Sequence, residues 1–197
     1  MRRNHVISRH ILPLMLAGLL AGCGASRSSQ TTMSGPPGLH QSGLTCAPFA
    51  RELSGIALYG EAFTWWDTAA GQYRRGNRPE VGSVLVFRRS SRLPSGHVSV
   101  VSRVINPRQI EVIQANWVSE QLDQDQLIVD VSERNDWTEV RVWYPPTNQI
   151  GTYTYTAYGF VLPPRPATYA ELSQATKPAL IYARDTKGRP PPRARGS

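Results

Sequence analysis

The fold is organised around the stretch LTCAPFAREL, residues 44–53. It follows an irregular segment rich in Gly, Pro and Ser, and apolar residues then recur at the spacing of one helical face. Thr45 is a candidate N-cap, and Pro48 suits a first helical turn because proline has no N–H to leave unpaired. We therefore expect a helix from about Cys46 to Leu58.

Cys46 is a candidate nucleophile. A helix start offers unpaired N–H groups and the positive end of the helix dipole, and both favour the reactive thiolate over the thiol. From this stretch alone, a small core residue at the helix start is an equal alternative. The chain has only two cysteines. If Cys23 carries a lipid, Cys46 has no intramolecular disulfide partner, which favours a chemical role. A Cys23–Cys46 disulfide is the competing reading.

The first 22 residues are typical of a secretory signal peptide, with a basic start and a short apolar run. The run ends in LAGC, residues 20–23, which resembles the bacterial lipobox, whose cysteine is diacylated. We expect cleavage before Cys23 and lipidation of Cys23. The protein would then be exported and anchored in the membrane of the cell envelope, in the outer membrane and facing the periplasm. The alternative is an ordinary signal peptide with a chance cysteine.

The formal net charge of +8 does not belong to the central part of the chain. Three arginines lie in residues 1–22, and six basic residues against one acidic residue lie in residues 177–197. Residues 23–176 hold equal numbers of basic and acidic side chains. A nucleic-acid-binding domain needs positive charge clustered on its folded surface, so we expect no nucleic-acid partner.

The patterning predicts a flexible tether over 23–43, one domain over 44–163 and a Pro/Arg-rich, mostly disordered tail over 164–197. A weak helix is expected in this tail, near Thr168–Ala175. A second helix is expected at about 64–73. Alternating residues then predict about six strands, at 82–87, 97–104, 109–114, 127–131, 138–144 and 155–162. Helices followed by hairpin-spaced strands indicate an α+β fold, in which N-terminal helices pack on a curved antiparallel sheet.

His97 is the candidate base, since it is the one histidine in the region expected to fold beyond the tether. An imidazole can take the proton of a thiol and return it to a leaving amine near neutral pH. A third group should orient the ring. Asn116 is the first choice and Gln114 the second, because both follow the next strand on one face. For Asn116 the alternative is a turn residue at the strand end.

Four segments together resemble a CHAP domain, the cysteine, histidine-dependent amidohydrolases and peptidases of the papain-like NlpC/P60 group. They are Cys46-Ala47 at a helix start, GSVLVF at 82–87, GHVSVV at 96–101 and QANW at 114–117. The resemblance covers about residues 44–162. It implies a papain-like fold, a Cys-His-polar site and cleavage of amide bonds in peptidoglycan. Many CHAP domains carry a Glu where this chain has Gln114, and an amide can orient an imidazolium but cannot neutralise it.

Three aromatic residues, Tyr59, Trp66 and Trp117, are candidate substrate-binding residues, and core packing is the alternative for each. We expect no cofactor and no metal, because Cys46 and His97 lack further Cys or His partners. The primary hypothesis is a peptidoglycan amidase or endopeptidase that works through an acyl-enzyme, with peptidoglycan as its partner. The alternative is a catalytically weak or inactive CHAP-like lipoprotein that binds the cell wall.

Overall fold

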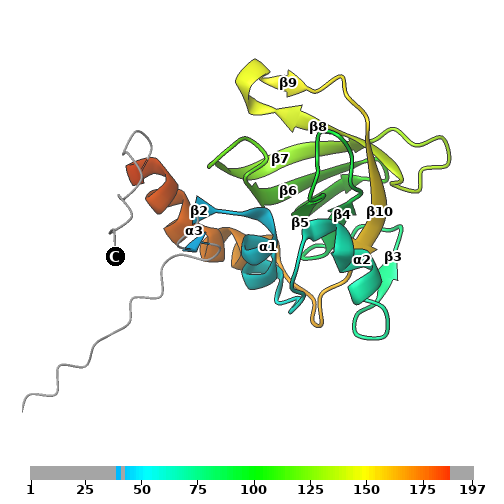
Figure 1. Cartoon of the computed structure of the whole chain (residues 1–197), viewed down its shortest axis with the longest axis horizontal. Helices are drawn as coiled ribbons and strands as arrows, with labels where there is room; N and C mark the ends of the chain where they lie inside the picture. The colour runs from blue at the N-terminus through cyan, green and yellow to red at the C-terminus, as the bar shows by residue number, and fades with distance from the viewer. Residues whose placement is uncertain (1–38, 41–42, 187–197) are drawn as a thin grey trace, which may run out of the picture. The chain divides into compact units, whose positions relative to one another are not determined.

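The structure is a computed structural model that describes residues 39–40 and 43–186. It begins with a two-stranded pair, β1 (Leu39–His40) and β2 (Gly43–Leu44), which leads directly into α1 (Cys46–Ser54) (Figure 1). These strands lie at the end of the predicted tether, and the rest of that tether, the signal peptide and Cys23 lie outside the described residues.

Helix α1 starts where the sequence predicts it and ends earlier. Thr45 takes the extended N-cap conformation, but its side chain makes no capping hydrogen bond. Gly55 adopts the left-handed conformation (φ +72°), and its N–H donates to the Arg51 carbonyl at 3.0 Å. Such a glycine closes a helix, so α1 does not reach Leu58. The second predicted helix is also shorter: a 3₁₀ turn, η1 (Ala62–Thr64), is followed by α2 (Trp65–Thr68).

The strands that follow α2 form one antiparallel sheet. In chain order its strands are β3 (Arg75–Gly76), β4 (Val84–Phe87), β5 (His97–Asn106), β6 (Gln109–Ala115), β7 (Leu122–Asp130), β8 (Glu139–Tyr144), β9 (Gln149–Ile150) and β10 (Tyr155–Val161). A second 3₁₀ turn, η2 (Pro145–Thr147), joins β8 to β9. Their order is β3-β10-β4-β5-β6-β7-β8-β9. The α+β class is confirmed.

The sheet closes into a barrel, which corrects the expectation of an open curved sheet. One half of β10 pairs with β4 (Phe160↔Leu85), and its beginning pairs with β8 (Tyr155↔Val140). The ring β10-β4-β5-β6-β7-β8 is therefore complete, with six antiparallel strands. The alternation of β10 indicated a strand but not two partners, because period-2 patterning shows which face is buried and not which neighbours a strand has.

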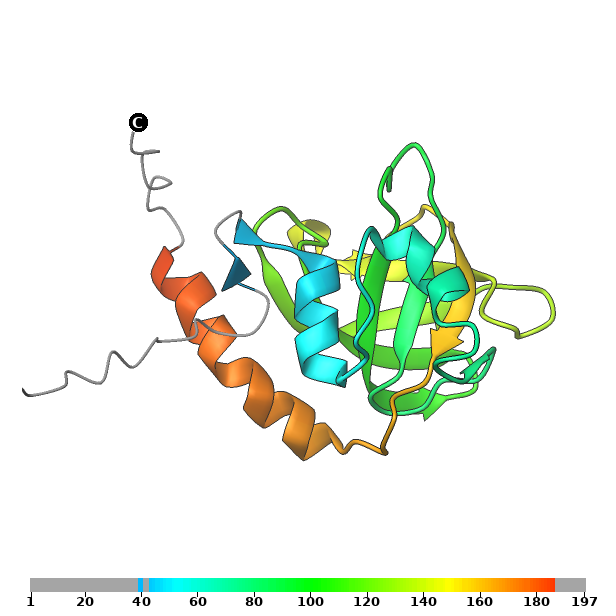
Figure 2. The ribbon, with the colours of Figure 1, turned by 60° about the horizontal axis from the view of Figure 1, so that its bottom comes forward.

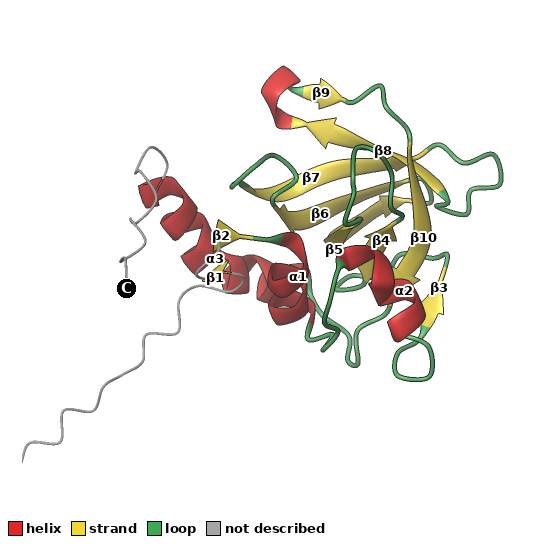
Figure 3. Cartoon of the chain, in the orientation of Figure 1, coloured by secondary structure: helices red, strands yellow, loops and turns green. Residues whose placement is uncertain are grey.

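Two apolar clusters follow from this arrangement. One fills the barrel and includes Leu85, Val101 and Phe160. The other lies between the outer face of the barrel and the helices, and it includes Phe49 of α1 and Val98 of β5. Figure 3 separates the helices (red) from the strands (yellow). Along β5, alternate residues thus face the helix layer or the barrel interior.

Helix α3 (Tyr169–Thr186) lies in the segment 164–197, where the sequence predicts a weak helix near Thr168–Ala175 in a mostly disordered tail, and it is longer than that weak helix. It runs beside α1 (Figure 2), and Leu172, Thr176 and Ala179 are buried on one face. The Tyr169 hydroxyl donates to Asp125 of β7 at 2.9 Å. Tertiary packing therefore orders a segment that its composition marked as a tail. Among the described residues, no helix combines the length and apolar character needed to cross a bilayer.

Two glycines test how the start of β5 is fixed. Gly96 (φ +69°) precedes His97, and a Cβ on it would lie 2.7 Å from the Phe63 nitrogen; Gly55 (φ +72°) has open space around it. An alanine at either position would be held at a positive φ, which costs a backbone strain of about 1–2 kcal/mol. We predict that Gly55→Ala loses roughly that much free energy of unfolding and that Gly96→Ala loses clearly more, measured by urea denaturation. Equal losses would show that the contact with Phe63 does not constrain this turn.

Candidate active site

Cys46 is the first residue of α1 and is partly exposed. Its sulfur lies near the backbone N–H groups of Val98, Ala47 and Cys46 itself. Burial raises the pKa of the thiol, and these N–H groups lower it by less. The net direction is opposite to the thiolate that the helix start predicts, because removing the sulfur from water disfavours the charged form more than the nearby dipoles favour it.

His97 is the first residue of β5, and its ring lies in the barrel interior with 3% of the residue exposed. The ring packs edge-on against Phe87, with centroids 5.6 Å apart, and against Trp117 at 5.1 Å. Burial lowers the pKa of His97 to about 4, although its hydrogen bond to Gln114 acts in the opposite direction. The imidazole is therefore neutral at pH 7.

A line of buried hydrogen bonds starts at the His97 ring. Nε2 of His97 lies 2.9 Å from Oε1 of Gln114, which also accepts the Ser99 hydroxyl. Nε2 of Gln114 donates to Oε1 of Gln126, and Nε2 of Gln126 donates to the Trp143 carbonyl at 2.6 Å. The line crosses four strands, from β5 through β6 and β7 to β8.

The line fixes which nitrogen of His97 carries the proton. The Trp143 carbonyl can only accept, so the NH₂ group of Gln126 must face it, and its oxygen must face Gln114. Gln114 must then turn its own NH₂ group to Gln126 and its oxygen to His97. Nε2 of the neutral ring is consequently the N–H donor. Nδ1 keeps a free lone pair, and it has no hydrogen bond within the described part of the chain.

Asn116, the first choice as third member, does not contact His97. It follows the end of β6, is exposed and has φ +62°. Its Oδ1 accepts the Glu120 N–H at 2.9 Å, and its own N–H donates to the Gln121 carbonyl at 2.7 Å. The turn that Asn116 forms directs its side chain along the loop, which is the alternative that the sequence left open. Gln114, the second choice, occupies the position beside the ring.

Cys46 lies beside the residue that follows His97, but its thiol has no hydrogen bond to the His97 ring among the described residues. The Cys46 sulfur lies by the N–H of Val98, the residue after His97. The Val98 side chain packs in the helix-side cluster, whereas His97 contacts Phe87 of the barrel cluster. The thiol and the imidazole are both uncharged, and they lie on opposite faces of β5 at its first residues.

Of the three aromatic residues expected to bind substrate, Trp117 adjoins His97. It lines a hollow of about 220 Å³ together with Arg92, Leu93, Tyr144 and Tyr155. Trp66 instead stacks on Tyr158, with centroids 5.9 Å apart, and Tyr59 is 68% exposed, with the Arg51 guanidinium above its ring. Tyr144 and Tyr155 carry no sequence signal for this position, because β8 and β10 meet only through barrel closure.

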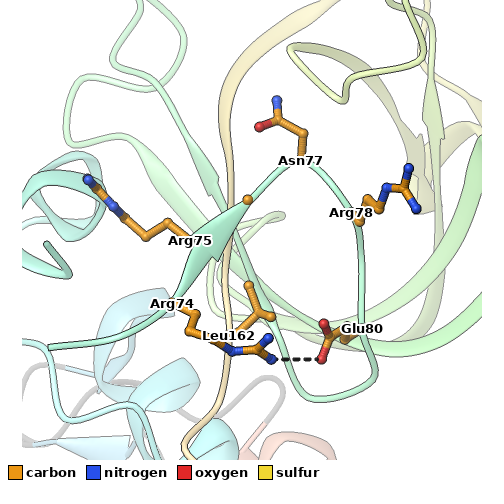
Figure 4. A pocket seen from close by; sticks show the side chains of 7 residues that line it. Arg74, Arg75, Asn77, Arg78, Glu80 and Leu162 are labelled. Atoms are coloured by element: carbon orange, nitrogen blue, oxygen red, sulfur yellow. Dashed lines mark hydrogen bonds and ion pairs between the residues drawn. The ribbon is translucent and has the colours of Figure 1, made fainter. Parts of the chain in front are cut away.

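A larger hollow of about 550 Å³ lies beside β3 and is formed mainly by charged side chains of residues 74–80 (Figure 4). Arg74 forms an ion pair with Glu80 at 3.5 Å. Arg75 and Arg78 point to opposite sides of the loop in Figure 4, so their guanidinium groups do not converge on one point. No three His, Cys, Asp or Glu side chains in residues 39–40 and 43–186 are grouped so that they could hold a metal ion.

The lowered pKa of His97 predicts a pH dependence of folding. Between pH 6.5, its ordinary pKa, and about 4, the unfolded chain binds a proton that the folded chain does not. His97 therefore stabilises the fold fully above pH 6.5 and loses about 1.4 kcal/mol per pH unit as the pH falls toward 4. Burial raises the pKa of Asp123 to about 6, which acts in the opposite sense between pH 3.8 and 6.

The measurement is therefore made in an Asp123→Asn background, which removes the opposing titration. We expect the free energy of unfolding of this variant, from urea titrations at several pH values, to fall between pH 6.5 and 4. For the double variant that also carries His97→Gln, the free energy of unfolding should fall less steeply, by about 1.4 kcal/mol per pH unit. Parallel curves for the two proteins would contradict a neutral buried His97.

Comparison with known proteins gives one family. No curated protein matches the chain. The model of the CHAP domain family matches residues 36–116, which contain Cys46, His97 and Gln114 and end at Asn116, before β7. CHAP domains are generally amidases or peptidases, and the match suggests a peptidoglycan hydrolase or amidase-like function.

Proposed function

We propose that the protein is a peptidoglycan amidase or endopeptidase with Cys46 as nucleophile, His97 as base and Gln114 as the residue that orients the ring. The observation that carries the proposal is the hydrogen bond from Nε2 of His97 to Gln114, which leaves Nδ1 as the basic nitrogen. It lies in the part of the chain that the CHAP model matches. We further propose that this part has a papain-like arrangement, with a helix-borne cysteine against the barrel.

Reaction begins from the neutral pair. Nδ1 of His97 takes the thiol proton as the sulfur attacks the carbonyl carbon of the amide, and the ring becomes imidazolium. The imidazolium then gives its Nδ1 proton to the leaving amine, and the acyl group stays on sulfur. Water attacks the thioester with His97 again as base, which releases the carboxylate and regenerates the thiol.

The start of α1 can stabilise the oxyanion of each tetrahedral intermediate. The first helical hydrogen bond runs from the Phe49 N–H to the Thr45 carbonyl at 3.3 Å, and Pro48 has no N–H. The N–H groups of Cys46 and Ala47 are therefore not used by the helix. Because the Thr45 side chain does not cap them, they are available beside the sulfur.

A catalytically weak or inactive wall-binding protein is the second candidate. Two observations favour it: the thiol has a raised pKa, and it makes no hydrogen bond to His97 within the described residues. A thiol that stays protonated is a poor nucleophile. For either function we also propose export and lipidation at Cys23, which would keep the domain at the cell envelope, next to its wall substrate.

The first test is digestion of purified peptidoglycan by the whole protein and by Cys46→Ala, with mass spectrometry of the soluble products. We expect new amine and carboxylate ends from the wild-type protein and none from the variant, since the variant has no nucleophile. The ends identify the bond that is cut. If a folded wild-type protein releases nothing but binds the wall, the second candidate stands and hydrolysis is excluded under these conditions.

The second test compares the two candidates for the third position. Gln114→Met keeps the length of the buried side chain but removes the acceptor for Nε2 of His97. We expect its kcat to fall at least about tenfold, and by no more than the 10²–10⁴-fold that acid–base catalysis contributes.

Asn116→Gly, which suits the positive φ, is the matched control and should stay near the wild-type kcat, with both folds checked by thermal melting. A large loss at Asn116 with little loss at Gln114 would reverse the assignment.

A further inference from the structure

Three arginines lie on the loop between β4 and β5, which also carries Gly96. Arg88 donates to the Ala157 carbonyl at 3.4 Å and lies over Tyr158, and Arg89 donates to the Pro94 carbonyl at 2.8 Å and lies over Phe63. Arg92 lies 4.4 Å over the Tyr153 ring, but within the described residues it has neither a hydrogen bond nor an acidic partner. Its planar set of donors is therefore free.

Arg92 borders the hollow beside His97. Trp117 forms the link: its ring centroid is 5.1 Å from that of His97 and 4.9 Å from that of Tyr155. Burial raises the pKa of Tyr155, and the positive charge of Arg92 lowers it by less. The guanidinium of Arg92 is therefore close enough to Tyr155 to affect its ionisation. The hollow thus has a cation at its border and aromatic rings as its walls, one ring away from the candidate base.

This combination fits a ligand with a carboxylate next to an apolar or flat part. A guanidinium binds a carboxylate through two parallel hydrogen bonds, and no acidic side chain lines the hollow to compete for it. The aromatic rings that line the hollow can pack against the apolar or flat part of such a ligand. The hollow beside β3 lacks this combination of a free guanidinium and aromatic rings. There Arg74 is paired with Glu80, and the other two arginines of that hollow point away from each other.

We propose that Arg92 binds a free carboxylate of the amide substrate near the bond that is cut, and so selects acidic peptides over their amidated forms. The proposal rests on the proposed hydrolase function. The proposal separates Arg92 from the other loop arginines by the property that ligand binding requires, a guanidinium without a hydrogen-bonded partner in the described part of the chain, at the border of the hollow that Trp117 lines.

The test uses stem-peptide fragments isolated from peptidoglycan and the same fragments after their carboxylates have been converted to carboxamides. For the wild-type protein, kcat/KM should favour the acidic fragments. In Arg92→Gln this ratio should fall about 10- to 100-fold, the range for losing a hydrogen-bonded charge pair. Arg78→Gln, at an exposed arginine of the other hollow, is the matched control and should keep the wild-type ratio. An unchanged ratio in Arg92→Gln would overturn the proposal.

Binding of the same fragments to the Cys46→Ala protein, followed by calorimetry, distinguishes the two ways of failing. Suppose that the acidic fragments bind, that Arg92→Gln weakens this binding, and that the wild-type protein cleaves nothing. This result would refute the hydrolase and keep the carboxylate site. Cleavage of both forms at equal rates would keep the hydrolase and refute the site. Tighter binding of the amidated form would refute the site whether or not cleavage occurs.

Discussion

The side-chain amide of Gln114 is the polar group on which the arrangement of the barrel interior depends. It is 1% exposed, so an unpaired oxygen or NH₂ group there would cost about 1–3 kcal/mol. Its oxygen accepts from His97 and Ser99, and its nitrogen donates to Gln126. Because a backbone carbonyl ends the line, no member can turn over without leaving a buried group unpaired. The tautomer of His97 on β5 is thus fixed by the backbone carbonyl of Trp143 on β8, three strands away.

The same interior keeps the site neutral before substrate binds. Burial lowers the pKa of His97 and raises that of Cys46, so both shifts oppose a thiolate–imidazolium pair. A carboxylate beside the ring would favour the imidazolium, whereas the amide of Gln114 orients the ring without a charge. For the proposed hydrolase, this environment favours transfer of the thiol proton during the attack on the amide, because an ion pair formed earlier would have to exist in a medium that penalises it.

Much of this structure is visible in the sequence, and the remainder depends on long-range geometry. Alternation located the six strands of the barrel, although β7 begins at Leu122 and not at 127, and it did not indicate the short strands β3 and β9. The helix start at Cys46 is where Thr45 and Pro48 indicated. Closure of the barrel was not visible, because strand periodicity does not name the second partner of β10. The start of helix α3 was visible as a weak helical pattern near Thr168–Ala175, but its continuation to Thr186 was masked by the basic, proline-containing composition. Gln114 and Asn116 are two residues apart, so strand periodicity places both on the same face of the sheet. Only the positive φ of Asn116 turns its side chain away from His97. The shift in the Cys46 pKa depends on burial, which the neighbouring sequence does not show.

The glutamine at position 114 is matched to the glutamine at position 126. A carboxylate at 114 could still accept from His97 and Ser99, but it could not donate to Oε1 of Gln126, and the two oxygens would face each other. Gln126 could turn its NH₂ group inward only by leaving the Trp143 carbonyl without its donor. An acidic residue at 114 therefore requires a different residue at 126, and the amide at 114 is one half of a pair that spans β6 and β7. The departure from the acidic residue that many CHAP domains carry is in this way accounted for by a partner on a strand that the family match does not reach.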